Sequence, residues 1–175
     1  MNSAVKSHVL FALCACLMWP WILGCDGGGD GGEESSGAEA EPIALAECTA
    51  CGMVVREQPA PRGQVVHRDG TREFFCAMSD LLYYIETPSP HGRITDVFVE
   101  VLPEETDPLE SDSREQPWVR AEDARYIVGV ERTGIMGPPV LAYLPEVDVE
   151  ALAADFGGEV VEWEELAARV IADAQ

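Results

Sequence analysis

The feature that most constrains the fold is a pattern of short predicted elements near the middle of the chain. Residues 64–67 and 71–75 flank an Asp69-Gly70 turn, a dipeptide that is typical of β-hairpins. Residues 79–85, which begin with a serine as candidate N-cap, carry leucine and isoleucine at helical spacing. Residues 94–102 then alternate like a half-buried strand. This segment therefore predicts the order strand, strand, helix, strand.

The same order of elements occurs a second time. Two apolar segments rich in β-branched residues, 126–130 and 140–144, flank a glycine-punctuated turn at residues 133–138. A short amphipathic helix is predicted over residues 149–156, because the glycine pair that follows it is typical of a helix C-cap. The chain closes with a predicted strand at 159–163 and a predicted helix at 164–174.

These patterns predict an α+β protein of two tandem modules with a C-terminal helix. The predicted bounds are residues 43–102 for the first module and residues 118–175 for the second. A short strand at 52–55 is predicted to lead into the first module. Residues 103–117 are acidic and unpatterned, and their prolines predict a surface loop.

The N-terminus has the composition of a cleaved signal peptide, residues 1–24. Its apolar run of fifteen residues, 9–23, is too short for a comfortable membrane span, which takes about 20 residues. The run ends in Ile-Leu-Gly before Cys25, which resembles a lipobox and predicts lipidation of Cys25. The alternative is an ordinary signal peptide with an incidental cysteine. Residues 25–42, rich in glycine and glutamate, predict a flexible acidic linker.

The chain is strongly acidic. Its formal net charge of −21 becomes −22 once Lys6, the single charged residue of the signal peptide, is removed. This charge argues against binding of nucleic acid or anionic lipid through a basic patch. The preferred interpretation of this charge is that it keeps the protein soluble, and the second is that it favours docking to a basic partner surface.

Residues 48–53, Cys-Thr-Ala-Cys-Gly-Met, place two thiols and a thioether within six positions. Soft sulfur donors select Cu(I), Zn(II) or iron–sulfur clusters, and a thioether favours Cu(I) over Zn(II). Three interpretations stay open. They are a Cu(I) site that includes Met53, a Zn(II) site that adds Cys76 and His67, and a Cys48–Cys51 disulfide.

Cys76 and Met136 are further candidate sulfur ligands. Cys76 is predicted at a strand-to-helix junction, which a treble-clef-like arrangement brings close to the preceding CxxC turn. It is equally consistent with a buried core cysteine. Met136 lies in a turn rather than on an apolar helical face, which favours a ligand, and the alternative is an ordinary loop methionine. Met78 is predicted to pack in the core and His67 to lie on the surface.

Catalytic motifs are missing from the sequence. It contains no GxSxG, HExxH, P-loop or GxGxxG pattern. A cysteine nucleophile would need an activated base nearby, and the histidines of the mature chain offer little. We therefore predict a binding protein rather than an enzyme.

The ordered set of motifs resembles the NosL family, the accessory lipoproteins of nitrous oxide reductase. In the first half the resemblance rests on residues 47–55, Phe74-Phe75-Cys76 and residues 80–83. In the second half it rests on Trp118 and on residues 124–129, 134–138 and 157–161. The first half alone also resembles the short heavy-metal-binding YHS/TRASH modules.

The resemblance implies a tandem ββαβ fold, also seen in part of the organomercurial lyase, and a Cu(I) chaperone. Family members bind copper through the cysteine and methionine of a Cys-Gly-Met motif, here Cys51 and Met53. Met136 would be a further ligand. Cys48 and Cys76 depart from the family pattern, and they leave open an all-thiolate site or a disulfide.

The resemblance also implies a role and a location. Copper would be delivered for assembly of the copper–sulfide centre of nitrous oxide reductase, with the apoprotein and copper transporters as partners. A lipid anchor on Cys25 would hold the protein at the periplasmic face of a membrane, and Asp26 favours the inner membrane. The competing functions are a structural zinc-binding lipoprotein domain and a thiol-redox lipoprotein domain.

Overall fold

The computed structural model describes residues 37–109, 113–132 and 136–173. The predicted signal peptide, the predicted lipidation at Cys25 and most of the predicted linker lie outside these described residues. No helix within the three ranges is both long and apolar enough to span a membrane.

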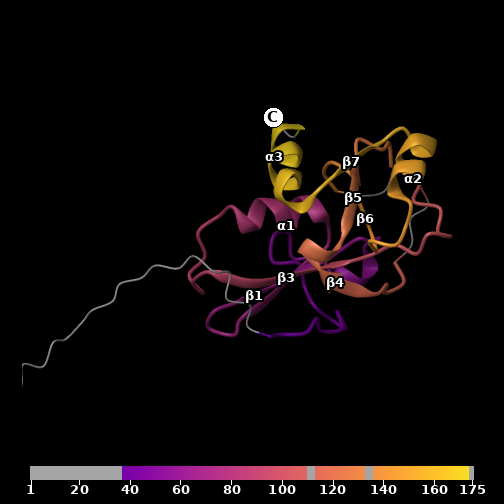
Figure 1. Ribbon diagram of the computed structural model, residues 1–175. Helices are drawn as coiled ribbons and strands as arrows, with labels where there is room; N and C mark the ends of the chain where they lie inside the picture. Colours follow the sequence, from indigo (N-terminus) through magenta and orange to yellow (C-terminus); the bar gives the residue numbers. More distant parts are fainter. Residues whose placement is uncertain (1–36, 110–112, 133–135, 174–175) are drawn as a thin grey trace, which may run out of the picture. The chain divides into compact units, whose positions relative to one another are not determined.

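The first module is an antiparallel sheet with one helix. Its elements are β1 (Gly63–His67), β2 (Arg72–Phe75), α1 (Met78–Ile85), β3 (Ile94–Glu100) and β4 (Trp118–Arg120). The strands lie in the order β2-β1-β3-β4 (Figure 1). The predicted turn joins β1 to β2: Gly70 has a φ of +86°, and the Thr71 N–H donates to the Asp69 carboxylate at 2.9 Å.

The second module repeats this topology. Its elements are β5 (Arg125–Val128), β6 (Val140–Tyr143), α2 (Val149–Phe156), β7 (Glu159–Val161) and the C-terminal helix α3 (Trp163–Asp173). In the strand order β6-β5-β7, β5 lies between β6 and β7, just as β1 lies between β2 and β3 in the first sheet. Asp148 caps α2 by accepting from the Ala151 N–H at 3.1 Å, and Gly157 ends it with a φ of +79°. The predicted α+β class with a C-terminal helix is confirmed.

Two local predictions are wrong. Ser79 is not the N-cap of α1, because the helix begins at Met78 and its N-cap is Ala77, which makes no side-chain cap. The Ser79 hydroxyl, inside the first turn, donates instead to the Met136 carbonyl at 3.0 Å. Residues 52–55 do not form a strand. They make a single bridge to Glu47 and lead into a 3-10 turn, η1 (Val55–Glu57).

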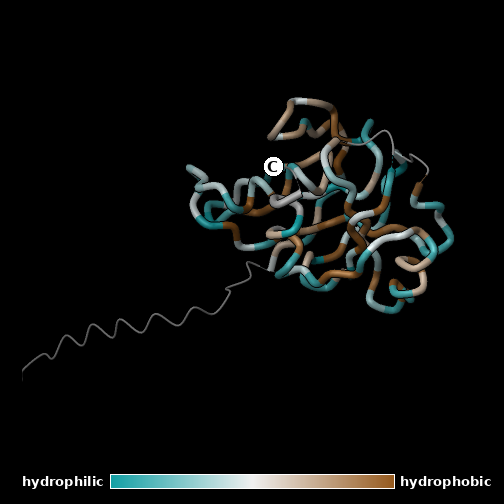
Figure 2. The backbone as a smooth tube through the Cα atoms, turned by 90° about the horizontal axis from the view of Figure 1, so that it is seen from above, coloured by the Kyte–Doolittle hydropathy of each residue, from teal (hydrophilic) through white to brown (hydrophobic). Residues whose placement is uncertain are grey.

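The two modules are joined by a strand and by a common core. β4 follows the acidic loop in sequence, yet it pairs with β3 in the first sheet. One buried cluster contains side chains from both modules, among them Val65, Phe75, Leu81, Leu82, Val99, Tyr126, Val128, Ala142 and Leu166. Figure 2 shows brown, hydrophobic stretches through the middle of this unit and mainly teal loops around it. Helices α1 and α3 contact each other beside this core (Figure 1).

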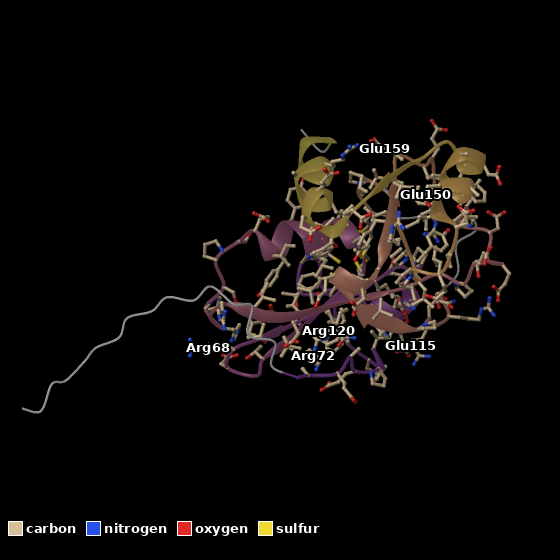
Figure 3. All side chains as sticks on the ribbon, in the orientation of Figure 1. Arg68, Arg72, Glu115, Arg120, Glu150 and Glu159 are labelled. Atoms are coloured by element: carbon tan, nitrogen blue, oxygen red, sulfur yellow. The ribbon has the colours of Figure 1, made fainter. Side chains whose placement is uncertain are left out.

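The first sheet has a second face, on which Phe98 lies. Phe98 is 4% exposed although it alternates with the core residue Val99. The guanidinium groups of Arg72 and Arg120 cover its ring, at 5.9 and 5.3 Å from the ring centroid. Figure 3 shows both arginines on the side of the first sheet away from α1. These arginines help to bury an apolar strand residue on a face over which the described residues place no helix (Figure 1).

Candidate metal centre

The Cys-Gly-Met motif forms a loop closed by backbone hydrogen bonds. The Cys48 N–H donates to the Met53 carbonyl at 2.7 Å, and the Gly52 N–H donates to the Cys48 carbonyl at 2.7 Å. Gly52 has a φ of +74° with open space where a side chain would lie. Glycine is therefore favoured here by backbone conformation rather than by lack of room.

This loop is attached to the end of β2. Cys48 makes a parallel bridge to Phe74, and the Thr49 N–H donates to the Phe74 carbonyl at 2.9 Å. Cys76 follows β2 directly, and its N–H donates to the Cys48 sulfur at 3.4 Å. The attachment brings residues about 25 positions apart in sequence into one cluster, as a treble-clef-like arrangement predicts.

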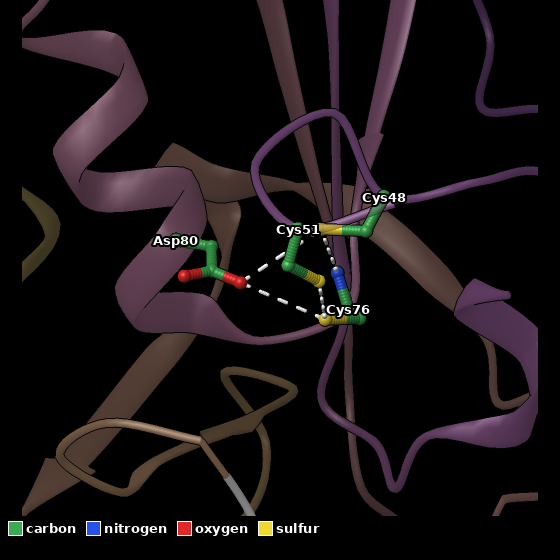
Figure 4. A group of neighbouring side chains, drawn as sticks. All are labelled: Cys48, Cys51, Cys76 and Asp80. Carbon is green, nitrogen blue, oxygen red and sulfur yellow. Dashed lines mark hydrogen bonds between the residues drawn. The ribbon is translucent and has the colours of Figure 1, made fainter. Parts of the chain in front are cut away.

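The cluster consists of Cys48, Cys51, Cys76 and Asp80, whose donor atoms all lie within 4.8 Å of one another (Figure 4). The Cys51 and Cys76 sulfurs are 3.5 Å apart. One carboxylate oxygen of Asp80 accepts hydrogen bonds from two thiols, those of Cys48 at 3.8 Å and Cys76 at 3.6 Å. Three thiols and a carboxylate in such proximity are a donor set for a soft or borderline metal ion.

Burial divides the three cysteines. Cys48 and Cys76 are 2% and 4% exposed, whereas Cys51 is exposed, and all three are free thiols. Burial raises the pKa of the Cys76 thiol, and hydrogen bonding and charge repulsion from Cys51 and Cys48 raise it further. A bound cation would reverse this preference, because it stabilises the thiolate form.

Asp80 is the member of the cluster that the sequence analysis missed. It lies in the first turn of α1, four residues after Cys76, so the strand-to-helix junction presents both side chains to the loop. The i, i+4 spacing across a helix start was the available signal. It could not be used because acidic residues are so numerous in this chain that no single one stands out.

Met53 and Met136 differ in burial and in which cysteines they are associated with. Met53 is half-buried and packs against the small apolar cluster that includes Cys48 and Cys76. Met136 is 40% exposed and lines, together with Cys76, a pocket of about 20 Å³ between the two modules. This volume suits a single ion or water molecule. Met78 lines the same pocket, but it is 3% exposed and packs in the core, as predicted.

His67 is not near the cysteine cluster. Its Nδ1 lies 3.1 Å from the Gly92 carbonyl, and its Nε2 lies 3.1 Å from both the Glu73 carboxylate and the Tyr84 hydroxyl. It is 1% exposed, so the prediction of a surface histidine is wrong. The fourth donor beside the three cysteines is Asp80 and not the histidine of the zinc interpretation.

The fold and the cluster define a small α+β protein with a thiol-rich candidate metal centre joined to a second module of like topology. The chain belongs to the NosL family, whose model matches residues 41–171. The family resemblance found in the sequence is thereby confirmed.

Two relatives extend this comparison. The copper-binding lipoprotein NosL of Stutzerimonas stutzeri is 28% identical over 174 residues, which cover 93% of this chain and 82% of the relative. The crystal structure of the copper chaperone NosL from Shewanella denitrificans is 25% identical, with a TM-score of 0.59. That match covers 73% of this chain and 94% of the Shewanella chain.

Proposed function

We propose that this protein is a Cu(I) carrier rather than an enzyme. The observation that carries the proposal is the exposed Cys51 thiol, which lies 3.5 Å from the buried Cys76 thiol in a cluster of three cysteines. The two relatives support copper as the ion, since one is a copper-binding lipoprotein and the other a copper chaperone. Cu(I) is the cargo in this proposal, and no bond in a substrate is broken.

The proposed donor set for Cu(I) is made of sulfur. The thiolates of Cys48, Cys51 and Cys76 supply charge and affinity, while the thioethers of Met53 and Met136 add neutral soft donors. Thioethers stabilise Cu(I) relative to Cu(II). The position of Met136 in the pocket that Cys76 lines supports its inclusion, although it comes from the second module.

The unequal burial of the cysteines supports transfer by ligand exchange. Cys48 and Cys76 hold the ion from the protein interior, while the exposed Cys51 leaves one side open to an approaching donor. A partner thiolate or thioether binds the ion before Cys51 releases it, so the ion is never free in solution. Transfer then needs only a difference in affinity between the two proteins.

Family membership supports a proposal for the partner and the location. We propose delivery of copper for the copper–sulfide centre of nitrous oxide reductase, with its apoprotein and copper transporters as partners. Acylation of Cys25 would anchor the protein at the periplasmic face of a membrane, with residues 26–42 as the tether. Mixing the Cu(I)-loaded protein with the apoprotein, separating the two and measuring copper in each tests the delivery step.

The copper proposal is tested by anaerobic titration of the reduced mature chain with Cu(I) against a competing chelator. We expect one Cu(I) per chain, and an affinity at least about tenfold weaker after Cys51→Ala, because the exposed thiolate is lost. Met53→Leu and Met136→Leu should also weaken binding while nearly conserving side-chain volume.

Met78→Leu is the matched control, because Met78 lines the same pocket as Met136 but is 3% exposed, packs in the core and lies outside the proposed donor set. It should bind Cu(I) like the wild type. Full Cu(I) binding by the Cys51→Ala variant would contradict the proposal. Equal weakening by all three methionine variants would remove the thioethers from the donor set.

A further inference from the structure

We propose that Cys48, Cys51, Cys76 and Asp80 form a four-donor site for Zn(II), and that Zn(II) and Cu(I) compete for the same three thiolates. The inference rests on the cysteines of the proposed function, but it is carried by a different observation. That observation is the Asp80 carboxylate, an oxygen donor placed among the three sulfurs.

Three separations among the four donors are close to those of a zinc tetrahedron, and all donor atoms lie within 4.8 Å of one another. Zn–S bonds of about 2.3 Å and a Zn–O bond of about 2.1 Å give S···S edges of about 3.8 Å and S···O edges of about 3.6 Å. The Cys51–Cys76 sulfurs are 3.5 Å apart, and Asp80 lies 3.6 Å from the Cys76 sulfur and 3.8 Å from the Cys48 sulfur. Zn(II) can therefore be placed among all four donors with little rearrangement.

The oxygen donor of Asp80 distinguishes Zn(II) binding from Cu(I) binding. Zn(II) is a borderline ion that accepts carboxylate oxygen together with thiolate sulfur. Cu(I) selects thiolate and thioether sulfur instead. Asp80 is thus expected to matter for Zn(II) and not for Cu(I), whereas the thioethers of Met53 and Met136 are expected to show the opposite dependence.

The surroundings of the donors support a closed site of this kind. The Cys76 N–H donates to the Cys48 sulfur, which offsets part of the negative charge of three thiolates. Asp80 lies in the first turn of the eight-residue helix α1, whose N-terminal end favours a nearby anion. Zn(II) bound here would connect the 48–53 loop, the end of β2 and α1, and would therefore stabilise the fold.

Competition follows from the shared sulfurs. One chain holds either Zn(II), with Cys48, Cys51, Cys76 and Asp80, or Cu(I), with the thiolates and thioethers. Addition of Cu(I) to the zinc-loaded protein should then release one Zn(II) for each Cu(I) bound. Each ion keeps its own oxidation state throughout the exchange, and only thiol protons are released during loading.

The experiment uses the reduced mature chain under anaerobic conditions. Zn(II) is titrated against a competing chelator, and Co(II) serves as a probe because a tetrahedral thiolate site gives it characteristic visible absorption. Asp80→Asn removes the anionic oxygen with almost no change in shape. Asp155→Asn, an exposed aspartate on α2, is the matched control.

We expect one Zn(II) per wild-type chain, a rise in Tm on loading, and an affinity at least about tenfold weaker in Asp80→Asn. The Cu(I) affinity of Asp80→Asn should be unchanged, which also shows that the loop has kept its structure. Wild-type Zn(II) affinity in Asp80→Asn, loss of both ions in that variant, or simultaneous binding of Zn(II) and Cu(I) would each overturn the inference. A wild type that binds Zn(II) but not Cu(I) would instead refute the copper proposal and the competition between the ions, while the four-donor Zn(II) site would stand.

Discussion

At the scale of single residues, Tyr143 is notable because its polar hydroxyl lies in an environment that does not solvate it. It is fully buried on β6, and its hydroxyl has no hydrogen-bond partner among the residues that the structure describes. Burial raises the pKa of Tyr143 to about 12, and although the nearby Arg132 lowers it and Asp107 raises it, burial dominates. A buried polar group without a partner costs about 1–3 kcal/mol.

We expect Tyr143→Phe to raise the free energy of unfolding at neutral pH by about 1 kcal/mol, because the unpaired hydroxyl is removed while the ring is kept. Urea unfolding followed by circular dichroism measures this change. A loss of stability on removal of the hydroxyl would show that the group is satisfied, for example by a bound water molecule.

The same residue predicts a pH dependence. In the unfolded chain Tyr143 ionises near pH 10, and in the folded protein only near pH 12, so the unfolded state releases its proton first. This difference leaves stability unchanged below about pH 10 and lowers it by roughly 3 kcal/mol as the pH rises through about 12, because the buried tyrosinate is disfavoured. Tyr143→Phe should remove this part of the alkaline destabilisation. The alkaline destabilisation that comes from Tyr126 should remain, because burial raises the pKa of that residue too.

At the scale of elements, the close approach of the 136–138 turn to α1 determines where Met136 lies. Gly137 has a φ of +71°, and a Cβ there would lie 2.4 Å from the Ser79 hydroxyl oxygen and 2.8 Å from the Ser79 Cβ. Gly157, at the end of α2, has a similar φ of +79° but nothing within 4 Å. The two glycines therefore share a backbone conformation and differ in crowding.

We expect Gly157→Ala to cost about 1 kcal/mol, the strain of the left-handed conformation, and to leave Cu(I) binding unchanged. Gly137→Ala should cost more, because the added methyl group also pushes the turn away from Ser79. Displacement of Met136 should then weaken Cu(I) binding as well. Urea unfolding and Cu(I) titration of both variants test this, and equal effects on stability and binding would contradict it.

At the scale of the whole molecule, a buried ion pair connects segments that are distant in sequence. Arg62 and Glu100 are both fully buried, and two hydrogen bonds of 2.5 and 2.7 Å join them. The Arg62 guanidinium also donates to backbone carbonyls of Gln58 at 3.1 Å and Ser113 at 3.2 Å. One side chain thus attaches the turn before β1 and the acidic segment before β4 to the first sheet.

We expect Arg62→Met to destabilise the protein by about 3–5 kcal/mol, because it leaves the Glu100 carboxylate buried without its partner. The double variant Arg62→Met with Glu100→Leu should be less destabilised than the single variant, since no unpaired charge remains. Denaturant unfolding of both variants decides this. Equal losses in the two would show that the backbone contacts of Arg62 outweigh its ion pair.

The topology could be predicted from local patterns because each module carries its own signals. The Asp69-Gly70 turn, the glycine after α2 and the strand β3 depend on neighbours within a few residues, and all three are present in the structure. The predicted half-buried alternation of β3 is wrong, because Asp96, Phe98 and Glu100 on its second face are buried as well. The three cysteines and the two methionines could likewise be selected as candidate ligands, because sulfur is chemically distinctive wherever it occurs.

The tertiary structure decided the rest. Ser79 serves the 136–138 turn instead of capping its own helix, His67 is enclosed by Glu73 and Tyr84, and Asp80 joins the cysteines. Each of these roles depends on a partner from another segment of the chain. The sequence by itself determined the elements and the sulfur chemistry, since these are local properties. Packing of the 48–53 loop against the end of β2 and the start of α1 decided which carboxylate, out of so many, lies within reach of the thiols.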